Sequence, residues 1–187
     1  MPFSRKPKKL APEALWEHAL RCLDRKPYST ADLQQKLKSR ADSPQALREV
    51  MNKLQEYGLL NDRKFAESFA TTRLERQAYG ASRVIRDLRT RRVAAKTAEQ
   101  AVRQVYGEVD EADLIRQYLK RKFRSKDLEQ FLSIETNLAS AYRRLRTAGF
   151  SADRSIKVLK EFTQRARELE EPLEDVPEEN EPAGPDD

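Results

Sequence analysis

The chain has 187 residues, of which 38% are hydrophobic and 36% are charged. This composition supports small hydrophobic cores between helical layers rather than a thick multilayer core. No run of apolar residues approaches the ~18 residues that a membrane-spanning helix needs. The single cysteine, Cys22, excludes an internal disulfide framework, and the first residues lack the apolar region of a secretory signal, so we expect a cytoplasmic protein without a membrane partner.

The net charge of +6 is distributed unevenly along the chain. Ten of the 31 acidic residues follow Arg167 and no basic residue does, so residues 1–167 hold 37 basic and 21 acidic residues, a net charge of +16. The strong positive charge of residues 1–167 favours binding to a polyanion or to an acidic protein surface. The alternative is that these charges only solvate the outer faces of helices.

The first part of the chain predicts a basic arm followed by a three-helix unit. Residues 1–12 hold three prolines among four basic residues, which is typical of a disordered segment. Helical periodicity begins at Glu13 and predicts a unit over residues 13–60. Ser29, and Ser43 followed by a proline, are start signals for its second and third helices.

A junction between two helical units is predicted at residues 57–69. Gly58 takes positive φ without steric cost, so it is a natural residue to end the third helix. Leu59 and Leu60 are expected to pack back against that helix.

The second half of the junction predicts a helix start. Asn61 or Asp62 is expected to cap the new helix, and Phe65 and Phe69 lie one turn apart on its inner face. The junction is therefore expected to be tight and apolar rather than a flexible linker.

The helical pattern recurs in a second unit over residues 61–108 and a third over residues 109–167. In the third unit, residues 125–133 hold three apolar residues in a less regular pattern. Apolar residues recur at the same four positions in all three units, and we call each set of three equivalent residues a column. These columns are Leu33, Val84 and Ala141; Leu37, Leu88 and Leu145; Met51, Val102 and Leu159; and Leu54, Val105 and Phe162. We therefore predict an all-α array of three tandem three-helix repeats, each with a small core.

Residues 168–187 are acidic and contain four prolines, so we expect a disordered tail. Such a tail either folds back on the basic body as an electrostatic brake or serves only to keep the protein soluble.

Enzymatic chemistry and metal binding find little support in the sequence. His18 is the only histidine and lies one helical turn before Cys22, but two ligands do not complete a zinc site. A nucleophile–histidine–acid set cannot be assembled convincingly around one histidine, and the five isolated glycines form no phosphate-binding loop. We expect a non-enzymatic protein without a cofactor or metal.

Basic residues form three clusters, which are the candidate contacts to DNA or to a protein partner. The clusters are Arg73, Arg76, Arg83, Arg86, Arg89, Arg91 and Arg92; Lys120, Arg121, Lys122 and Arg124; and Arg143, Arg144 and Arg146. Arginine binds phosphates and carboxylates alike, and phosphate contacts carry little sequence preference. Tyr118 and Tyr142 lie among these residues, either to stack on bases or, more commonly, as the edge of the core.

The junction sequence Gly58-Leu59-Leu60-Asn61-Asp62-Arg63-Lys64-Phe65-Ala66 is similar to the signature Gly-Leu-Leu-(Asp/Asn)-Asp-x-x-Phe-Ala of the bacterial regulatory protein RecX family, modulators of the RecA recombinase. Three further pieces occur in the family's order: Ser29-x-x-Asp32-Leu33-x-x-x-Leu37, Gly80-x-x-Arg83-x-Ile85-x-x-x-Arg89 and Leu145-x-x-x-Gly149-Phe150-Ser151. The chain departs from the family at Arg92, where a glycine is usual before an apolar residue.

The resemblance implies an elongated, curved array that binds along the groove of the RecA–single-stranded DNA filament. It implies inhibition of ATP hydrolysis and strand exchange, and hence roles in homologous recombination, DNA repair and the SOS response. We expect a monomer. The signature residues are interpreted as structural: Gly58, Leu59, Leu60, Asp62, Phe65, Gly80, Gly149 and Phe150.

The alternative function is a helical DNA-binding protein that acts without a recombinase partner.

Overall fold

The computed structural model describes residues 9–170, and within this range the protein is all-α, without a strand. The α-helices of the described part are α1 (Pro12–Arg25), α2 (Thr30–Lys38), α3 (Pro44–Glu56), α4 (Asp62–Gln77), α5 (Ala81–Thr90), α6 (Ala95–Tyr106), α7 (Glu111–Lys122), α8 (Leu128–Ser133), α9 (Glu135–Thr147) and α10 (Ala152–Leu159). A 3₁₀ helix, η1 (Gln164–Glu170), follows α10.

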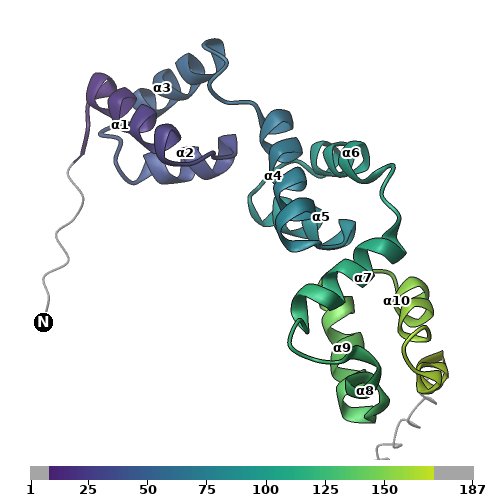
Figure 1. Cartoon of the computed structure of the whole chain (residues 1–187). Helices are drawn as coiled ribbons and strands as arrows, with labels where there is room; N and C mark the ends of the chain where they lie inside the picture. The colour runs from purple at the N-terminus through teal and green to yellow at the C-terminus, as the bar shows by residue number, and fades with distance from the viewer. Residues whose placement is uncertain (1–8, 171–187) are drawn as a thin grey trace, which may run out of the picture.

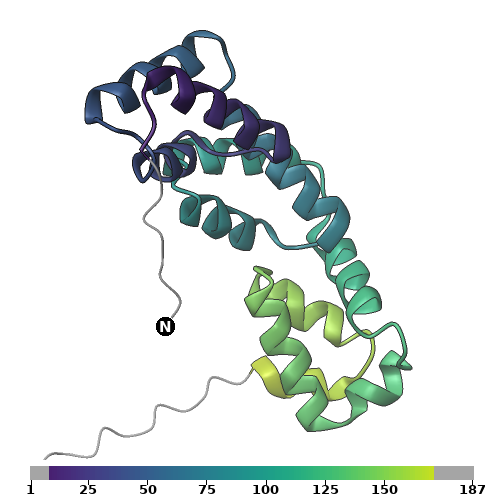
Figure 2. The same ribbon diagram turned by 90° about the vertical axis from the view of Figure 1, so that its left-hand side faces the viewer.

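The helices form three groups that follow one another along an elongated array (Figure 1). We call α1–α3 unit 1, α4–α6 unit 2 and α7–α10 unit 3. Figure 2 shows that the array is curved, with units 1 and 3 at the two ends of an arc. The predicted fold class of tandem three-helix repeats in a curved array is confirmed.

Each unit has its own core, as the apolar columns predicted. The columns that contain Leu33, Leu37 and Met51 are buried in every unit. The fourth column is buried at Leu54, whereas its partners Val105 and Phe162 are partly buried. Burial of these columns supplies the apolar area that stabilises helices too short to persist alone.

Several helix starts are set by the side chains that the sequence indicated. Ser29 accepts a hydrogen bond from the amide of Asp32 at 3.1 Å, and Ser43 accepts one from Ala46 at 3.1 Å. Asn61 accepts one from Lys64 at 3.0 Å. Each of these bonds satisfies an amide that has no partner within its own helix.

Three helices end in the same turn, with one residue at positive φ. Gly58 (φ 67°), Arg92 (φ 58°) and Gly149 (φ 92°) follow α3, α5 and α9. In each turn this residue donates its amide to the carbonyl three residues before it, and the next residue donates to the carbonyl five before it. This Schellman pattern caps the helix end. Arg92 therefore keeps the turn that glycine makes at the ends of α3 and α9.

Two residues of the junction differ from the expectation. Leu59 is 44% exposed, because the turn at Gly58 directs the following residue outward and only Leu60, 8% exposed, reaches the core of unit 1. Asp62 does not cap its own helix, since Asn61 does so, and it contacts unit 1 instead.

The predicted boundaries also differ at both ends. Residues 9–12, assigned to the disordered arm, are ordered: Leu10 forms a β-bridge with Ala41 and packs on the core of unit 1, and Pro12 starts α1. An isolated leucine among lysines and prolines gave no periodic signal. Residues 168–170 end η1, so residues 1–8 and 171–187 of the predicted arm and tail lie outside the described residues.

Unit 3 contains more helix than the other two units. The short helix α8 lies between α7 and α9, where the sequence pattern was less regular, and Leu132 from α8 is fully buried. None of the helices in residues 9–170 is long and apolar enough to cross a membrane.

Candidate partner-binding surface

Units 2 and 3 meet where two glycines bring their backbones into direct contact. The amide of Gly80 donates to the carbonyl of Ala148 at 2.9 Å. A Cβ atom on Gly80 would lie 2.4 Å from the carbonyl oxygen of Gly149, and one on Gly149 would lie 2.3 Å from the amide nitrogen of Arg83. Since real Cβ atoms do not approach backbone so closely, these positions admit only glycine without a backbone shift.

Aromatic side chains close the same contact, which we call the second joint. The rings of Tyr118 and Phe150 are 5.6 Å apart at 71°, and those of Tyr79 and Tyr118 are 6.4 Å apart. Tyr106 donates its hydroxyl to the carbonyl of Tyr79 at 2.9 Å. Burial raises the pKa of Tyr106 to about 12 and also raises the pKa of Tyr118. Tyr118 is therefore a residue of the core edge and has little ring surface to offer a base.

Four candidate arginines bond to backbone carbonyls at or beside the second joint. Arg83 and Arg86 both donate to the carbonyl of Thr147, at 3.2 and 3.3 Å, and the guanidinium of Arg83 also lies 4.7 Å from the centre of the Tyr79 ring. Arg121 donates to the carbonyl of Glu75 at 2.9 Å, and Arg146 donates to that of Phe150 at 2.5 Å. Arg83 and Arg86 cap the end of α9 and Arg121 caps the end of α4, each from the other unit, so part of the predicted binding set helps to hold the array together.

The first joint, between units 1 and 2, is polar. Ser29, fully buried, donates its hydroxyl to the carbonyl of Arg91 at 2.5 Å. Asp62 accepts a hydrogen bond from the amide of Thr30 at 2.7 Å, so it caps α2 from the neighbouring unit. Asp32 forms ion pairs with Arg92 at 3.0 Å and Arg91 at 3.8 Å. Arg91 and Arg92 therefore belong to this joint and not to a surface shared with Arg83.

The remaining candidate cations are exposed, and their side chains have no ion-pair or hydrogen-bond partner among residues 9–170. They are Arg76, Arg89, Lys120, Lys122, Arg124, Arg143 and Arg144. The bond from Arg121 to Glu75 places the last turn of α7 beside the last turn of α4, next to Arg76. Arg144 is near enough to Tyr118 for its charge to oppose the rise in that pKa. Arg73 is half-buried, bonds to Gln77 and stacks on Phe69.

The structure therefore brings Arg76, Lys122 in the last turn of α7 and Arg144 to one region of units 2 and 3. We call Arg76, Lys122 and Arg144 the joint cation patch. Since these cations are exposed and without a partner in the described chain, they are the groups most available to phosphates or carboxylates. Lys120 lies on the opposite face of α7, which carries Asp113 and Arg116, and Arg124 lies beyond the end of that helix. Arg89 lies on α5, near the first joint instead.

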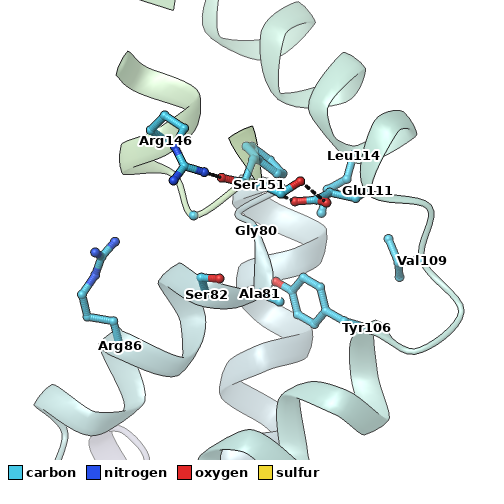
Figure 3. Close-up of a pocket in the computed structure, with 12 residues that line it drawn as sticks. Gly80, Ala81, Ser82, Arg86, Tyr106, Val109, Glu111, Leu114, Arg146 and Ser151 are labelled. Atoms are coloured by element: carbon cyan, nitrogen blue, oxygen red, sulfur yellow. Dashed lines mark hydrogen bonds between the residues drawn. The ribbon is translucent and has the colours of Figure 1, made fainter. Parts of the chain in front are cut away.

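A cleft of about 520 Å³ opens between units 2 and 3. Figure 3 shows Arg86 and Arg146 on one side of it and Glu111 on the other, with Ser82 between them. Glu111 accepts two hydrogen bonds from Ser151, one from its amide at 2.7 Å and one from its hydroxyl at 2.8 Å. Sequence reasoning missed Ser82, Tyr106 and Glu111, because no local pattern marks residues that meet only across units.

The sole histidine lies beside the sole cysteine, with Nε2 of His18 3.8 Å from Sγ of Cys22. Burial, followed by the charges of Arg40 and other basic residues, lowers the pKa of His18. Within residues 9–170 no group of three potential metal ligands comes together.

Comparisons with known proteins converge on one family. Residues 61–102, which span most of unit 2, match the family model described as RecX, second three-helix domain. The chain is 35% identical over 113 residues to "Regulatory protein RecX" of Halorhodospira halophila, covering 60% of this chain and 68% of that protein. It is 31% identical over 105 residues to the protein of the same name from Caldanaerobacter subterraneus, covering 56% of this chain and only 53% of that relative.

The fold also matches a solved structure. The chain superposes on the crystal structure of RecX from Lactobacillus salivarius with a TM-score of 0.63. The match has 20% sequence identity and covers 81% of this chain and 96% of that one. At this identity the likeness supports the fold of the array.

Proposed function

Because the chain belongs to the RecX family, we propose that it is a non-enzymatic regulator that binds the RecA–single-stranded DNA filament and restrains its ATP hydrolysis and strand exchange. It acts in the cytoplasm as a monomer, in homologous recombination, DNA repair and the SOS response. The joint cation patch is the observation that carries the proposal, since its cations have no partner among residues 9–170 and can bind an acidic filament of protein and DNA.

The curved array supports binding to a repeating partner. Three units in one arc present several contact points in series, so each contact made raises the effective concentration for the next (Figure 2). A series of contact points fits a filament, in which protomers recur at regular intervals, better than a single small ligand.

The experiment measures ATP turnover by RecA on single-stranded DNA with this protein at substoichiometric ratio, and strand exchange in parallel. We expect both rates to fall. The variant Lys122→Glu/Arg144→Glu should lose most of the inhibition, whereas Arg25→Glu/Lys38→Glu, with the same charge change on exposed residues of unit 1, should retain it. Unchanged turnover and exchange with the unmodified protein would exclude the proposed function.

The second candidate function is DNA binding without a recombinase, favoured by the same exposed cations. The two functions differ in salt dependence and target. Tight, sequence-selective binding to naked duplex DNA at moderate salt would support the second function. Weak binding that falls steeply with salt would leave DNA as only one part of the target.

A further inference from the structure

The cleft between units 2 and 3 combines charge of both signs with an apolar wall. Arg86 and Arg146 lie at one end and Glu111 at the other (Figure 3). Ala81 and Val109, both partly exposed, are apolar residues of its lining. A volume of about 520 Å³ is within the range of pockets that accept small ligands or a few side chains.

The two arginines keep hydrogen-bonding capacity for a ligand. Arg86 donates one terminal nitrogen to the carbonyl of Thr147, and Arg146 donates one to that of Phe150. A guanidinium has five N–H donors, so most of the donors on each side chain remain available. These carbonyl contacts also hold the two side chains in place, which reduces the entropy lost when a carboxylate binds between them.

The opposite end of the cleft disfavours a nucleic acid. Both carboxylate oxygens of Glu111 are held by Ser151, so this negative charge is fixed at the cleft wall. A phosphate backbone in the cleft would meet it, whereas a peptide amide would donate a hydrogen bond to it. Tyr106, the aromatic lining residue best placed for a base, is half-buried and its hydroxyl is engaged by Tyr79.

We propose that this cleft binds a short peptide segment of a protein partner that carries an acidic side chain next to an aliphatic one. The carboxylate lies between Arg86 and Arg146, the aliphatic side chain packs on Ala81 and Val109, and a backbone amide faces Glu111. The inference rests on the proposed function, because it assigns the cleft to the protein component of the filament, while the joint cation patch faces phosphates.

Ser82 allows the cleft to be tested without replacing its arginines. It lines the cleft, is exposed and makes no side-chain hydrogen bond in the described chain. Ser82→Glu places a carboxylate where the acidic side chain of the ligand would bind. As the second residue of α5, this glutamate also favours the helix, so the variant should fold at least as well as the unmodified protein.

The experiment measures binding of each variant to RecA–single-stranded DNA filaments and, separately, to naked oligo-deoxythymidine, by fluorescence anisotropy with thermal unfolding as the folding control. We expect Ser82→Glu to weaken filament binding about tenfold and to leave oligo-deoxythymidine binding within about twofold. Ser82→Gln controls for size. Gln34→Glu, on an exposed residue of α2, controls for the added charge.

Each outcome decides the inference. Selective loss of filament binding by Ser82→Glu supports it. Equal loss of filament and oligo-deoxythymidine binding shows that the cleft faces DNA and overturns it, and so does full retention of filament binding. If the unmodified protein does not bind the filament, the proposed function itself fails. This failure can be told apart from failure of the cleft inference, because it is seen before any variant is measured.

Discussion

The two joints of this array are built from opposite kinds of contact. At the second joint, the core of unit 3 includes Ala78 from unit 2, and Tyr79 and Tyr106 pack against the cores of both units. At the first joint the cores of units 1 and 2 share no residue, and the units are connected by Ser29, Asp62 and ion pairs to Asp32.

This difference indicates which joint can adjust its angle. Packed apolar surfaces and glycine contacts have one arrangement of low energy, because any shift opens a void or creates a clash. The ion pairs of Asp32 are open to solvent on the arginine side, and such pairs contribute little and weaken with salt. We therefore expect units 2 and 3 to behave as one body, and unit 1 to move relative to them.

The largest predicted effect is at the glycine contact of the second joint. Gly149→Ala adds a Cβ at 2.3 Å from the amide nitrogen of Arg83 in a residue with φ of 92°. We expect a loss of about 3–5 kcal/mol in the free energy of unfolding, from backbone strain and overpacking together. Urea denaturation followed by circular dichroism measures it.

The matched control is Gly58→Ala, which has a similar φ of 67° and open space around the added Cβ. It should cost only about 1–2 kcal/mol, the penalty of the left-handed conformation alone. If both variants lose the same stability, the close approach at the second joint contributes nothing.

The second prediction concerns alkaline pH. Because burial raises the pKa of Tyr106 to about 12, the folded protein favours the neutral phenol. This stabilisation is fully present below about pH 10 and is lost as the pH rises from about 10 to 12. Discounting for partial exposure, we expect a loss of about 1–2 kcal/mol.

Tyr106→Phe isolates this contribution from the titration of other groups. The variant loses the bond to the carbonyl of Tyr79, so it should be about 1 kcal/mol less stable at neutral pH. Its stability should then fall less steeply above pH 10 than that of the unmodified protein. Parallel curves for the two proteins would contradict the assignment.

The third prediction tests the polar joint. Asp62→Ala removes the cap that unit 2 supplies to the amide of Thr30, at a cost of about 1 kcal/mol. It should also widen the range of angles between units 1 and 2, seen as a larger radius of gyration in small-angle X-ray scattering. Asn61→Ala removes a cap inside unit 2, so it should cost similar stability but leave the scattering unchanged.

The smallest effect is expected at Arg92. Arg92→Gly relieves a positive φ but removes the ion pair with Asp32, and these changes of about 1 kcal/mol each nearly cancel. We expect a net change within about 0.5 kcal/mol and a weaker dependence of stability on salt. Urea denaturation at low and high salt measures both, and an unchanged salt dependence would show that this ion pair does not contribute.

The fold was largely predictable because its determinants are local. The caps at Ser29, Ser43 and Asn61 and the turn at Gly58 act within a few residues of their own position. The repeated apolar columns are periodic, so they can be found without a structure. Leu10 was missed because its burial depends on a bridge to a residue 31 positions away, at Ala41.

The candidate surface was less predictable, because sequence shows where the charges are but not what they contact. Arg83 and Arg121 are part of basic clusters, yet both bond to carbonyls of other helices. Asp62 belongs to a helix-start pattern, yet it caps a helix of the preceding unit. Such roles depend on how units pack against one another, and no local propensity encodes that geometry.

The shared core of units 2 and 3 also has a consequence for folding. The three cores form from contacts between near neighbours in sequence, so each unit can nucleate without closing a long loop. Tyr79 and Tyr106 pack against the cores of both units, so unfolding of either unit exposes part of the core of the other. Units 2 and 3 should therefore unfold together. Unit 1 can open alone, so amide hydrogen exchange should divide the chain near Asn61 into a more labile first part and a more protected second part.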